Sequence, residues 1–305
     1  MTSRREFLRL LGTGALVMGL IDSPLISPLE KAVSSAFAQT IPKDYDHQVP
    51  NWREISKGLY FARVDIYNKG KKVDTVAVSK INPEFNQIRV FNSYEGPENY
   101  ELLTIEDWRD RTNATIMFNS AQYKARPYAA PCALIMCDGR KKGQKFNKTA
   151  RGMLVAEPTD EKLPKANLLD FDFDYFDPDT TKYTQGVQHW PILLDKNGNI
   201  KVKRTDWQAN RTVVSKDRER NIVVFTTEGG YFTLYEFGRF LKDSNFNIEC
   251  AMNMDGGYEA EMVVKSKDFN YVTYGQFETY GPMHNASIPG ARCRIPGVIG
   301  VFPRK

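Results

Sequence analysis

The sequence predicts an α+β fold, a single domain with a strand-rich mixed β core and a few packed helices. From Leu59 onward, short apolar runs of strand length alternate with turns that contain glycine, asparagine or aspartate. Two segments carry a helix-start signal that is followed by apolar residues at helical spacing. No internal repeat stands out and no second linker divides the chain, so a single core is expected.

The composition of the 305-residue chain is that of a globular protein with a sizeable core. It is 41% hydrophobic and 12% aromatic. The formal net charge is +5, and no block rich in lysine or arginine is present, since Arg140-Lys141-Lys142 is short and sits in a turn. Proteins that bind nucleic acids concentrate basic residues in a patch or stripe. We therefore expect no nucleic-acid partner.

Residues 1–38 carry the pattern of a twin-arginine signal peptide. Ser3-Arg4-Arg5-Glu6-Phe7-Leu8 supplies the paired arginines, and Ala36-Phe37-Ala38 offers a small-x-small cleavage site. A membrane anchor is the alternative, but the apolar stretch Leu10–Ile21 is short and rich in glycine for a bilayer span. We therefore expect the twin-arginine export machinery as a partner, a periplasmic or other extracytoplasmic location, and no stable membrane span in the mature chain.

The four cysteines are expected to be structural. Twin-arginine export carries folded proteins, so the chain would fold in the reducing cytoplasm, where disulfides do not persist. No CxxC pair occurs that would indicate a zinc site, and the spacing does not fix any disulfide pairing. The positions are Cys132, Cys137, Cys250 and Cys293.

The first half of the chain reads as an arm followed by strands and one helix. Residues 39–58 are polar and contain prolines, which indicates an N-terminal arm before a domain at 59–305. The Asn68-Lys69-Gly70 turn predicts a hairpin, and Thr104 is the expected N-cap of the first helix, with Asp107 in its first turn. Strands are expected at 59–67, 72–80, 85–92, 115–119 and 132–137.

The clearest local unit lies in the second half. Thr233-Leu234-Tyr235-Glu236 has capping-box spacing, and it opens a helix with Leu234, Phe237 and Leu241 on one face. This helix feeds the apolar run 248–254, which predicts a strand–helix–strand unit. Further strands are expected at 168–176, 186–195, 200–203, 210–214, 221–227, 262–264 and 297–302.

Polar residues stand at the end of the 248–254 strand, in Asn253-Met254-Asp255-Gly256-Gly257. Asn253 and Asp255 are two residues apart, so on a strand they point to the same face. The two glycines allow a ligand or another backbone to approach closely. The pair is therefore either a satisfied structural network or a functional site.

An ordered series of segments between residues 115 and 302 resembles the phosphodiester glycosidase family. The segments are Phe118–Tyr123, Gln188–Pro191, Arg211–Val213, Thr227–Gly229, Thr233-Leu234, Asn253–Gly257 and Gly300–Phe302. The chain departs from the family pattern at Tyr258, Glu259 and Trp190, which replace smaller residues. The resemblance implies an exported hydrolase that cleaves a sugar-1-phosphate diester in a glycan or cell-envelope polymer.

That reaction needs an acid that helps the phosphate leave, a group that activates water, and positive groups that hold the phosphate. The resemblance implies Asp255 and Glu228 as the catalytic acid and base. Arg211 would clamp the phosphate through its guanidinium fork. The amides of Gly256 and Gly257 would form an anion nest.

Three amide side chains are expected to contact the substrate, namely Asn119, Gln188 and Asn253. Each assignment has a structural alternative. Asp255 can cap the glycine turn, Arg211 can form an ion pair, and buried amides commonly satisfy backbone groups. Glu259 and Glu261 are expected on the solvated face of the strand that follows.

No metal or cofactor is required by the sequence. The histidines His47, His189 and His284 are scattered and form no known ligand pattern. Oxygen ligands such as Asp255, Glu228 and Asn253 could hold Ca²⁺ or Mg²⁺. The alternative to an enzyme is a non-catalytic carbohydrate-binding or exopolysaccharide-processing protein that kept the fold, with Trp190 and Tyr258 stacking on sugar rings.

Overall fold

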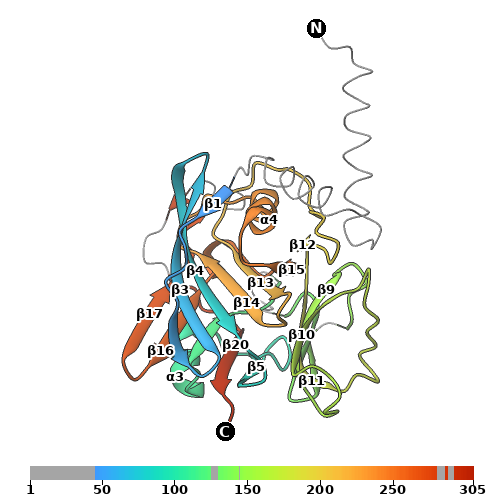
Figure 1. Cartoon of the computed structure of the whole chain (residues 1–305). Helices are drawn as coiled ribbons and strands as arrows, with labels where there is room; N and C mark the ends of the chain where they lie inside the picture. The colour runs from blue at the N-terminus through green and yellow to red at the C-terminus, as the bar shows by residue number, and fades with distance from the viewer. Residues whose placement is uncertain (1–44, 125–129, 144, 280–285, 288–291) are drawn as a thin grey trace, which may run out of the picture. The chain divides into compact units, whose positions relative to one another are not determined.

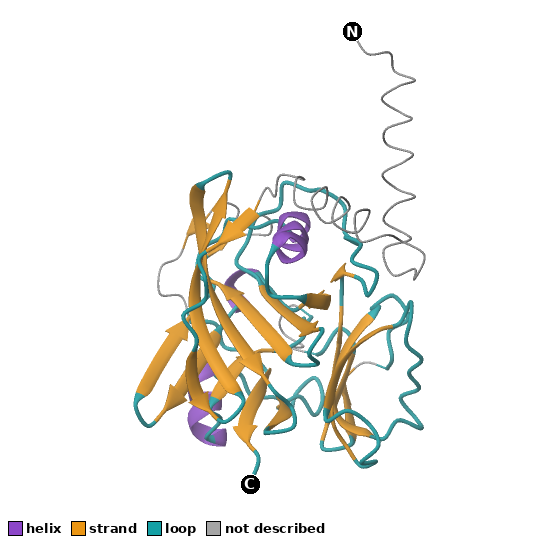
Figure 2. Ribbon diagram, viewed as in Figure 1, coloured by secondary structure: helices purple, strands orange, loops and turns teal. Residues whose placement is uncertain are grey.

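The computed structural model describes residues 45–124, 130–143, 145–279, 286–287 and 292–305. Tyr45–Lys305 forms one compact unit, and its described part is dominated by strands, with two α-helices (Figures 1 and 2). The expected signal peptide at 1–38 lies outside the described residues. Within the described ranges, no helix is long and apolar enough to cross a membrane.

The largest sheet has eight strands. Their order is β1-β3-β4-β14-β13-β15-β12, and β2 pairs with β3. The bounds are β1 Tyr45–His47, β2 Arg53–Ser56, β3 Leu59–Asn68, β4 Lys71–Ile81, β12 Ile192–Leu194, β13 Thr212–Asp217, β14 Ile222–Thr227 and β15 Ile248–Asn253. The predicted hairpin is therefore present as β3 and β4.

The segment expected to be an arm is part of this sheet. Tyr45 pairs with Asn68 across β1 and β3, and its side chain is only 1% exposed. Its hydroxyl donates a hydrogen bond to Glu236 in the helix α4 (Leu234–Asp243). The boundary predicted at Leu59 is therefore wrong for the sheet, which begins at Tyr45 because a buried aromatic ring fixes the segment there.

Two five-stranded sheets and a two-stranded ribbon (β18 and β19) complete the described fold. One sheet has the order β10-β9-β11-β7-β8, and the other has the order β17-β16-β6-β20-β5. The bounds are β5 Asn86–Asn92, β6 Ile116–Asn119, β7 Leu134–Cys137, β8 Arg140–Gly143, β9 Gly152–Pro158, β10 Ala166–Asp170, β11 Tyr183–His189, β16 Met262–Ser266, β17 Phe269–Thr273, β18 Phe277–Glu278, β19 Ala286–Ser287 and β20 Gly297–Pro303. Apolar side chains from all three large sheets meet in one core.

The two helices begin where the sequence predicts. Thr104 and Asp107 form a reciprocal capping box at α3 (Ile105–Thr112). Thr233 accepts a hydrogen bond from the Glu236 amide at the start of α4 (Leu234–Asp243). The Glu236 carboxylate accepts the hydroxyl of Tyr45, and α4 packs against β1, β12 and β15 (Figure 1).

Every strand pair described is antiparallel, so the expected mixed core is wrong in that respect. The strand–helix–strand unit exists as β14, α4 and β15. These two strands run parallel, but β13 lies between them and pairs with both in the opposite direction. The expected strand at 200–203 is reduced to one bridge between Leu194 and Ile200.

One chain passage joins two of the large sheets at the Asp255 turn. After β15, the chain leaves the eight-stranded sheet through Asp255 and Gly256, and a short 3₁₀ turn, Gly257–Glu259, leads into β16 of another sheet. β16 pairs with β6, so the ends of β6 and β15 lie close together. The polar turn predicted from sequence therefore sits at the junction of two sheets.

Candidate active site

The Asp255 turn is held by the side chain of Asn119 at the end of β6. Its Nδ2 donates to the Asp255 carbonyl at 2.8 Å, and its Oδ1 accepts from Thr212 Oγ1 at 2.6 Å. The amide of Glu261 donates to the same Oδ1 at 3.2 Å. Since these contacts occupy the amide group, Asn119 positions the turn, and the expectation that it orients a substrate hydroxyl is not supported.

Gly256 and Gly257 make the turn tight. Gly257 has a φ of +67°, and a Cβ on it would lie 2.6 Å from Glu278 Oε2. The Gly256 amide donates to Asp255 Oδ1 at 3.1 Å, and the Gly257 amide donates to the Asn210 carbonyl at 2.9 Å. Both amides therefore donate hydrogen bonds inside the turn, which argues against the predicted anion nest.

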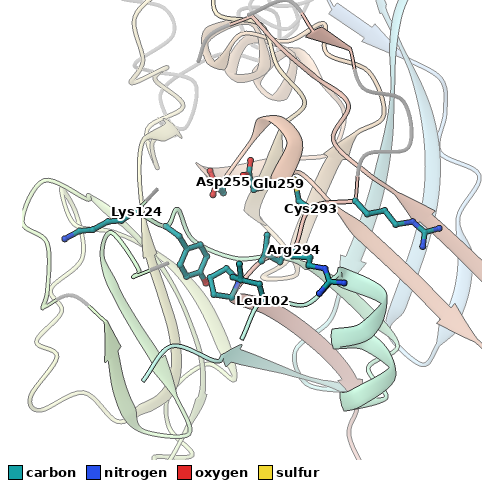
Figure 3. A pocket seen from close by; sticks show the side chains of 10 residues that line it. Leu102, Lys124, Asp255, Glu259, Cys293 and Arg294 are labelled. Atoms are coloured by element: carbon teal, nitrogen blue, oxygen red, sulfur yellow. The ribbon is translucent and has the colours of Figure 1, made fainter. Parts of the chain in front are cut away.

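A cleft of about 420 Å³ opens beside this turn (Figure 3). Asp255 and Glu259 present their carboxyl groups on the same wall, and Cys293 lies next to Glu259 (Figure 3). Basic side chains line other parts of the cleft. The full lining is Leu102, Tyr123, Lys124, Asp255, Glu259, Arg292, Cys293, Arg294, Ile295 and Pro296.

The pKa values of both carboxyl groups of the cleft are raised. Burial, followed by the negative charge of Glu259, raises the pKa of Asp255 well above its ordinary value, although the Gly256 amide opposes the shift. Burial and the charge of Glu278 also raise the pKa of Glu259. Two close, buried carboxyl groups do not ionise together readily. One of them therefore keeps its proton at a pH at which an isolated carboxyl group has lost it. The protonated group can act as an acid and the ionised group as a base.

Glu259 was expected on a solvated strand face, and that expectation is wrong. It lies in the 3₁₀ turn that follows Asp255, and its carboxyl group lies on the wall of the cleft that also carries Asp255 (Figure 3). The spacing in Asp-Gly-Gly-Tyr-Glu was the signal that could have found it. Glu261 is also not solvated, since it is fully buried in the structure.

Arg211 lies behind the turn and does not line the cleft. Its Nε donates to the Phe232 carbonyl at 3.1 Å, and its Nη2 donates to the Trp207 carbonyl at 2.7 Å. A Cβ on Gly256 would lie 3.5 Å from Nη1. Burial lowers the pKa of Arg211 to about 10, so it stays cationic at neutral pH. It supplies a buried positive charge beside the turn, and its fork is occupied by carbonyls, which argues against the predicted phosphate clamp.

Glu228 belongs to a separate ion pair. Both of its oxygens accept hydrogen bonds from Arg63, each at 2.6 Å, and the Tyr271 hydroxyl donates to Oε1 at 2.7 Å. It is not among the residues that line the cleft. The structure therefore does not bring Glu228 together with Asp255 in this cleft, which argues against the predicted catalytic role.

Gln188 is fully buried and its amide is saturated. Its Oε1 accepts from the amides of Leu134 and Asn147, and its Nε2 donates to the carbonyls of Asn147 and Ala150. These contacts fasten the segment around Asn147 to the sheet. Gln188 is thus a structural residue and not the expected substrate contact.

Asn253 faces the protein interior. Its Nδ2 donates to the Met254 carbonyl at 2.5 Å, while its buried Oδ1 has no partner among the described residues. The Asn253 carbonyl lies 2.7 Å from His189 Nδ1, and burial lowers the pKa of His189 to about 4. Asn253 does not line the cleft, so the proposed contact with substrate hydroxyls is not supported.

The cationic side chains of the cleft were missed by sequence reasoning. Lys124 follows Tyr123 beyond β6, and Arg292 and Arg294 precede β20. These segments have no hydrophobic periodicity and no recognisable motif, so sequence gave no signal for them. Together they place positive charge around a carboxyl pair.

The oxygen ligands considered for a metal are not assembled by the fold. Glu228 is held by Arg63, away from the cleft that contains Asp255. Among the described residues, no group of three or more His, Cys, Asp or Glu side chains converges in a way that could hold a metal ion. All four cysteines are free thiols, with Cys137 and Cys250 buried.

The family model of the phosphodiester glycosidases matches residues 112–302, which span β6 to β20 and include the Asp255 turn and most of the cleft. The chain belongs to the phosphodiester glycosidase family. At the level of that family, membership supports hydrolysis of phosphodiester glycosides. A search of curated proteins finds no significant match.

Solved structures share the fold of this phosphodiester glycosidase. One is the catalytic domain of zebrafish N-acetylglucosamine-1-phosphodiester alpha-N-acetylglucosaminidase, auto-inhibited by its pro-peptide, with a TM-score of 0.54 and 15% identity over 86% of this chain and 89% of that chain. Another is a hypothetical protein from Synechocystis, with a TM-score of 0.54 and 12% identity over 84% of this chain and 64% of that chain. At these identities the likeness shows the fold alone.

Proposed function

We propose that this phosphodiester glycosidase is an exported hydrolase that cleaves a glycosyl phosphodiester, a sugar-1-phosphate diester, in a glycan or cell-envelope polymer. The observation that carries the proposal is the Asp255–Glu259 carboxyl pair in a cleft with basic side chains. Family membership supports the bond type, and the twin-arginine pattern at residues 1–38 supports export.

The pair divides the chemistry between two groups. Asp255, whose pKa is raised by burial and by the charge of Glu259, carries the proton. It gives that proton to the bridging phosphate oxygen as the bond from this oxygen to the anomeric carbon breaks. Glu259 takes a proton from water, whose oxygen forms the new bond to the anomeric carbon. The products are a free sugar and a phosphate monoester.

The basic residues make the cleft electrostatically favourable for a substrate that contains phosphate. Lys124, Arg292 and Arg294 line the cleft, and their positive charge would attract such an anionic substrate. Arg211 acts at a distance, because its buried charge next to Gly256 supports the position of the turn. No metal or cofactor is needed for this scheme.

The alternative is carbohydrate binding without turnover. Trp190 stacks on His189 with ring centroids 5.2 Å apart and an angle of 17° between the planes, and it does not line the cleft. Tyr258 is half-buried beside Glu259 and could still stack on a sugar. Of the two aromatic residues expected to stack on sugar rings in this alternative, only Tyr258 remains a candidate.

The test is a panel of methyl diesters of hexose 1-phosphates incubated with the purified mature protein. N-acetylglucosamine is the first sugar to try, because the zebrafish relative is named for that sugar. Release of reducing sugar from at least one diester is expected. Binding of several diesters without any sugar release, by protein that is folded by circular dichroism, would favour the non-catalytic alternative.

A further inference from the structure

Two cationic side chains of the cleft have no partner among the residues that the structure describes. Lys124 and Arg294 are exposed, and within these described ranges neither side chain forms an ion pair or hydrogen bond. Arg292 differs, since its Nη1 lies 3.7 Å from Glu106 Oε1 and its guanidinium lies over the ring of Tyr274. Lys124 and Arg294 are therefore available to bind anions.

The two available cations lie on opposite sides of the carboxyl pair. Figure 3 shows Lys124 at one end of the cleft and Arg294 toward the other, with Asp255 between them. The charges are thus spread along the cleft and are not gathered at the reacting group. This arrangement suits a ligand with more than one anionic group.

The size of the cleft supports the same conclusion. Its volume of about 420 Å³ lies in the lower part of the range, roughly 300–1,000 Å³, that ligand sites occupy. A sugar and its phosphate would fill much of that space, so further units of a chain would pass Lys124 and Arg294. A single phosphodiester carries one negative charge, and one cation is enough to match it.

We infer that the substrate is a polyanionic chain of sugars joined by phosphodiesters, in which Lys124 and Arg294 bind the phosphates that flank the linkage being cleaved. The inference rests on the proposed function and names its substrate class. A chain of this kind presents negative charges at regular intervals on both sides of the reacting bond. The two cations are opposite in sign to those charges and lie on both sides of the carboxyl pair.

The experiment compares a synthetic chain of three glycosyl phosphates with the one-phosphate methyl diester of the same sugar. At about 50 mM salt, kcat/KM for the chain should exceed that for the single diester by at least about fivefold. The ratio of kcat/KM for the chain to kcat/KM for the single diester should fall toward one in the double variant Lys124→Gln/Arg294→Gln. It should also fall in about 0.5 M salt, because exposed charges are screened there.

The matched control is Lys71→Gln/Lys267→Gln, which removes two exposed lysines outside the cleft. This control should keep the wild-type preference for the chain. Equal kcat/KM for the chain and the single diester in the wild type would overturn the inference. So would a preference that the cleft variant retains in full.

Calorimetric binding separates this inference from the proposed function. If no diester is hydrolysed, the proposed function fails, and the same two probes are titrated into the wild type and both double variants. Tighter binding of the three-phosphate chain than of the single diester, lost only in the cleft variant, supports the inference. Equal binding of the two probes, or no binding of either, overturns it.

Discussion

At the residue scale, one proton shared between Asp255 and Glu259 connects the geometry to the proposed chemistry. Both side chains are partly buried on one wall of the cleft, and Glu278 adds negative charge near them. A protonated carboxyl group can act as an acid and an ionised one as a base, so the pair has both functions at the same pH. Hydrolysis should fall as pH rises above the raised pKa of the acid.

Asp255→Asn should lower kcat by about 10²–10⁴-fold, the usual contribution of a general acid. The fold should persist, because the asparagine oxygen can still accept from the Gly256 amide, as Asp255 Oδ1 does. Sugar release and the melting temperature are the measurements. Glu228→Gln is the control, since Glu228 sits in the ion pair with Arg63. Near-wild-type hydrolysis by Asp255→Asn, or inactivation by Glu228→Gln, would contradict the assignment.

Glu261 is a second protonated carboxyl group, but it acts on stability. It is fully buried, its Oε1 accepts from the Cys293 amide at 3.1 Å, and its Oε2 has no partner among the described residues. Burial raises the pKa of Glu261 to about 9 from a usual value of 4.5. The folded protein therefore keeps a proton that the unfolded chain releases between these values. This contribution to stability is complete below the pKa of the unfolded chain, 4.5, and is lost as pH rises toward the pKa of the folded protein, about 9.

Glu261→Gln should remove that pH dependence. Relative to this variant, the free energy of unfolding of the wild type should fall by about 1.4 kcal/mol per pH unit between about pH 6 and 8. Urea denaturation at the two pH values measures it. The exposed Glu161→Gln is the control and should follow the wild type. Parallel pH dependence in the wild type and Glu261→Gln would show that Glu261 is ionised in the folded protein.

At the scale of elements, the 3₁₀ turn Gly257–Glu259 sets the position of the pair. Gly257 has a left-handed backbone, and a Cβ on it would lie 2.6 Å from Glu278 Oε2, so the Glu278 carboxylate would have to move. Gly198 has a similar φ of +75°, but nothing lies within 4 Å of a Cβ placed there. Both glycines therefore need a positive φ, but only a Cβ at Gly257 would contact another side chain.

Gly257→Ala and Gly198→Ala should each lose about 1–2 kcal/mol of stability, since alanine disfavours the left-handed region. Only Gly257→Ala should also lose more than about tenfold in kcat/KM, because the Glu278 carboxylate that faces the carboxyl pair must move and the strained turn carries Glu259. Thermal unfolding and sugar release are measured on both variants. Equal effects on activity would mean that the Gly257 turn does not position the carboxyl pair.

Local signals in the sequence predicted the elements well where one segment determines its own structure. The Asn68-Lys69-Gly70 turn gave the β3–β4 hairpin, and Thr104 and Thr233 gave the starts of both helices. The strands β9 and β17 had no comparable turn signal and were missed. The region 186–195 was expected as one strand, but it divides into β11 and β12, which belong to different sheets.

At the scale of the whole molecule, the site depends on contacts between distant segments, and this limited what sequence could predict. Asp255 was found because its turn is a compact motif. The ion pair of Glu228 was not foreseen because its partner Arg63 lies 165 residues away in the chain. Asn119 was expected to contact substrate, whereas its contact with the Asp255 turn is a hydrogen bond across 136 residues. The basic side chains of the cleft come from irregular segments without a motif.

The position of bond cleavage tests the central claim most directly. A diester that the panel shows to be a substrate is hydrolysed in water enriched in ¹⁸O, and mass spectrometry locates the label. Attack at the anomeric carbon, as the Asp255–Glu259 pair implies, places ¹⁸O in the released sugar and none in the phosphate monoester. Label in the phosphate would show attack at phosphorus and would contradict a glycosidase mechanism for this cleft.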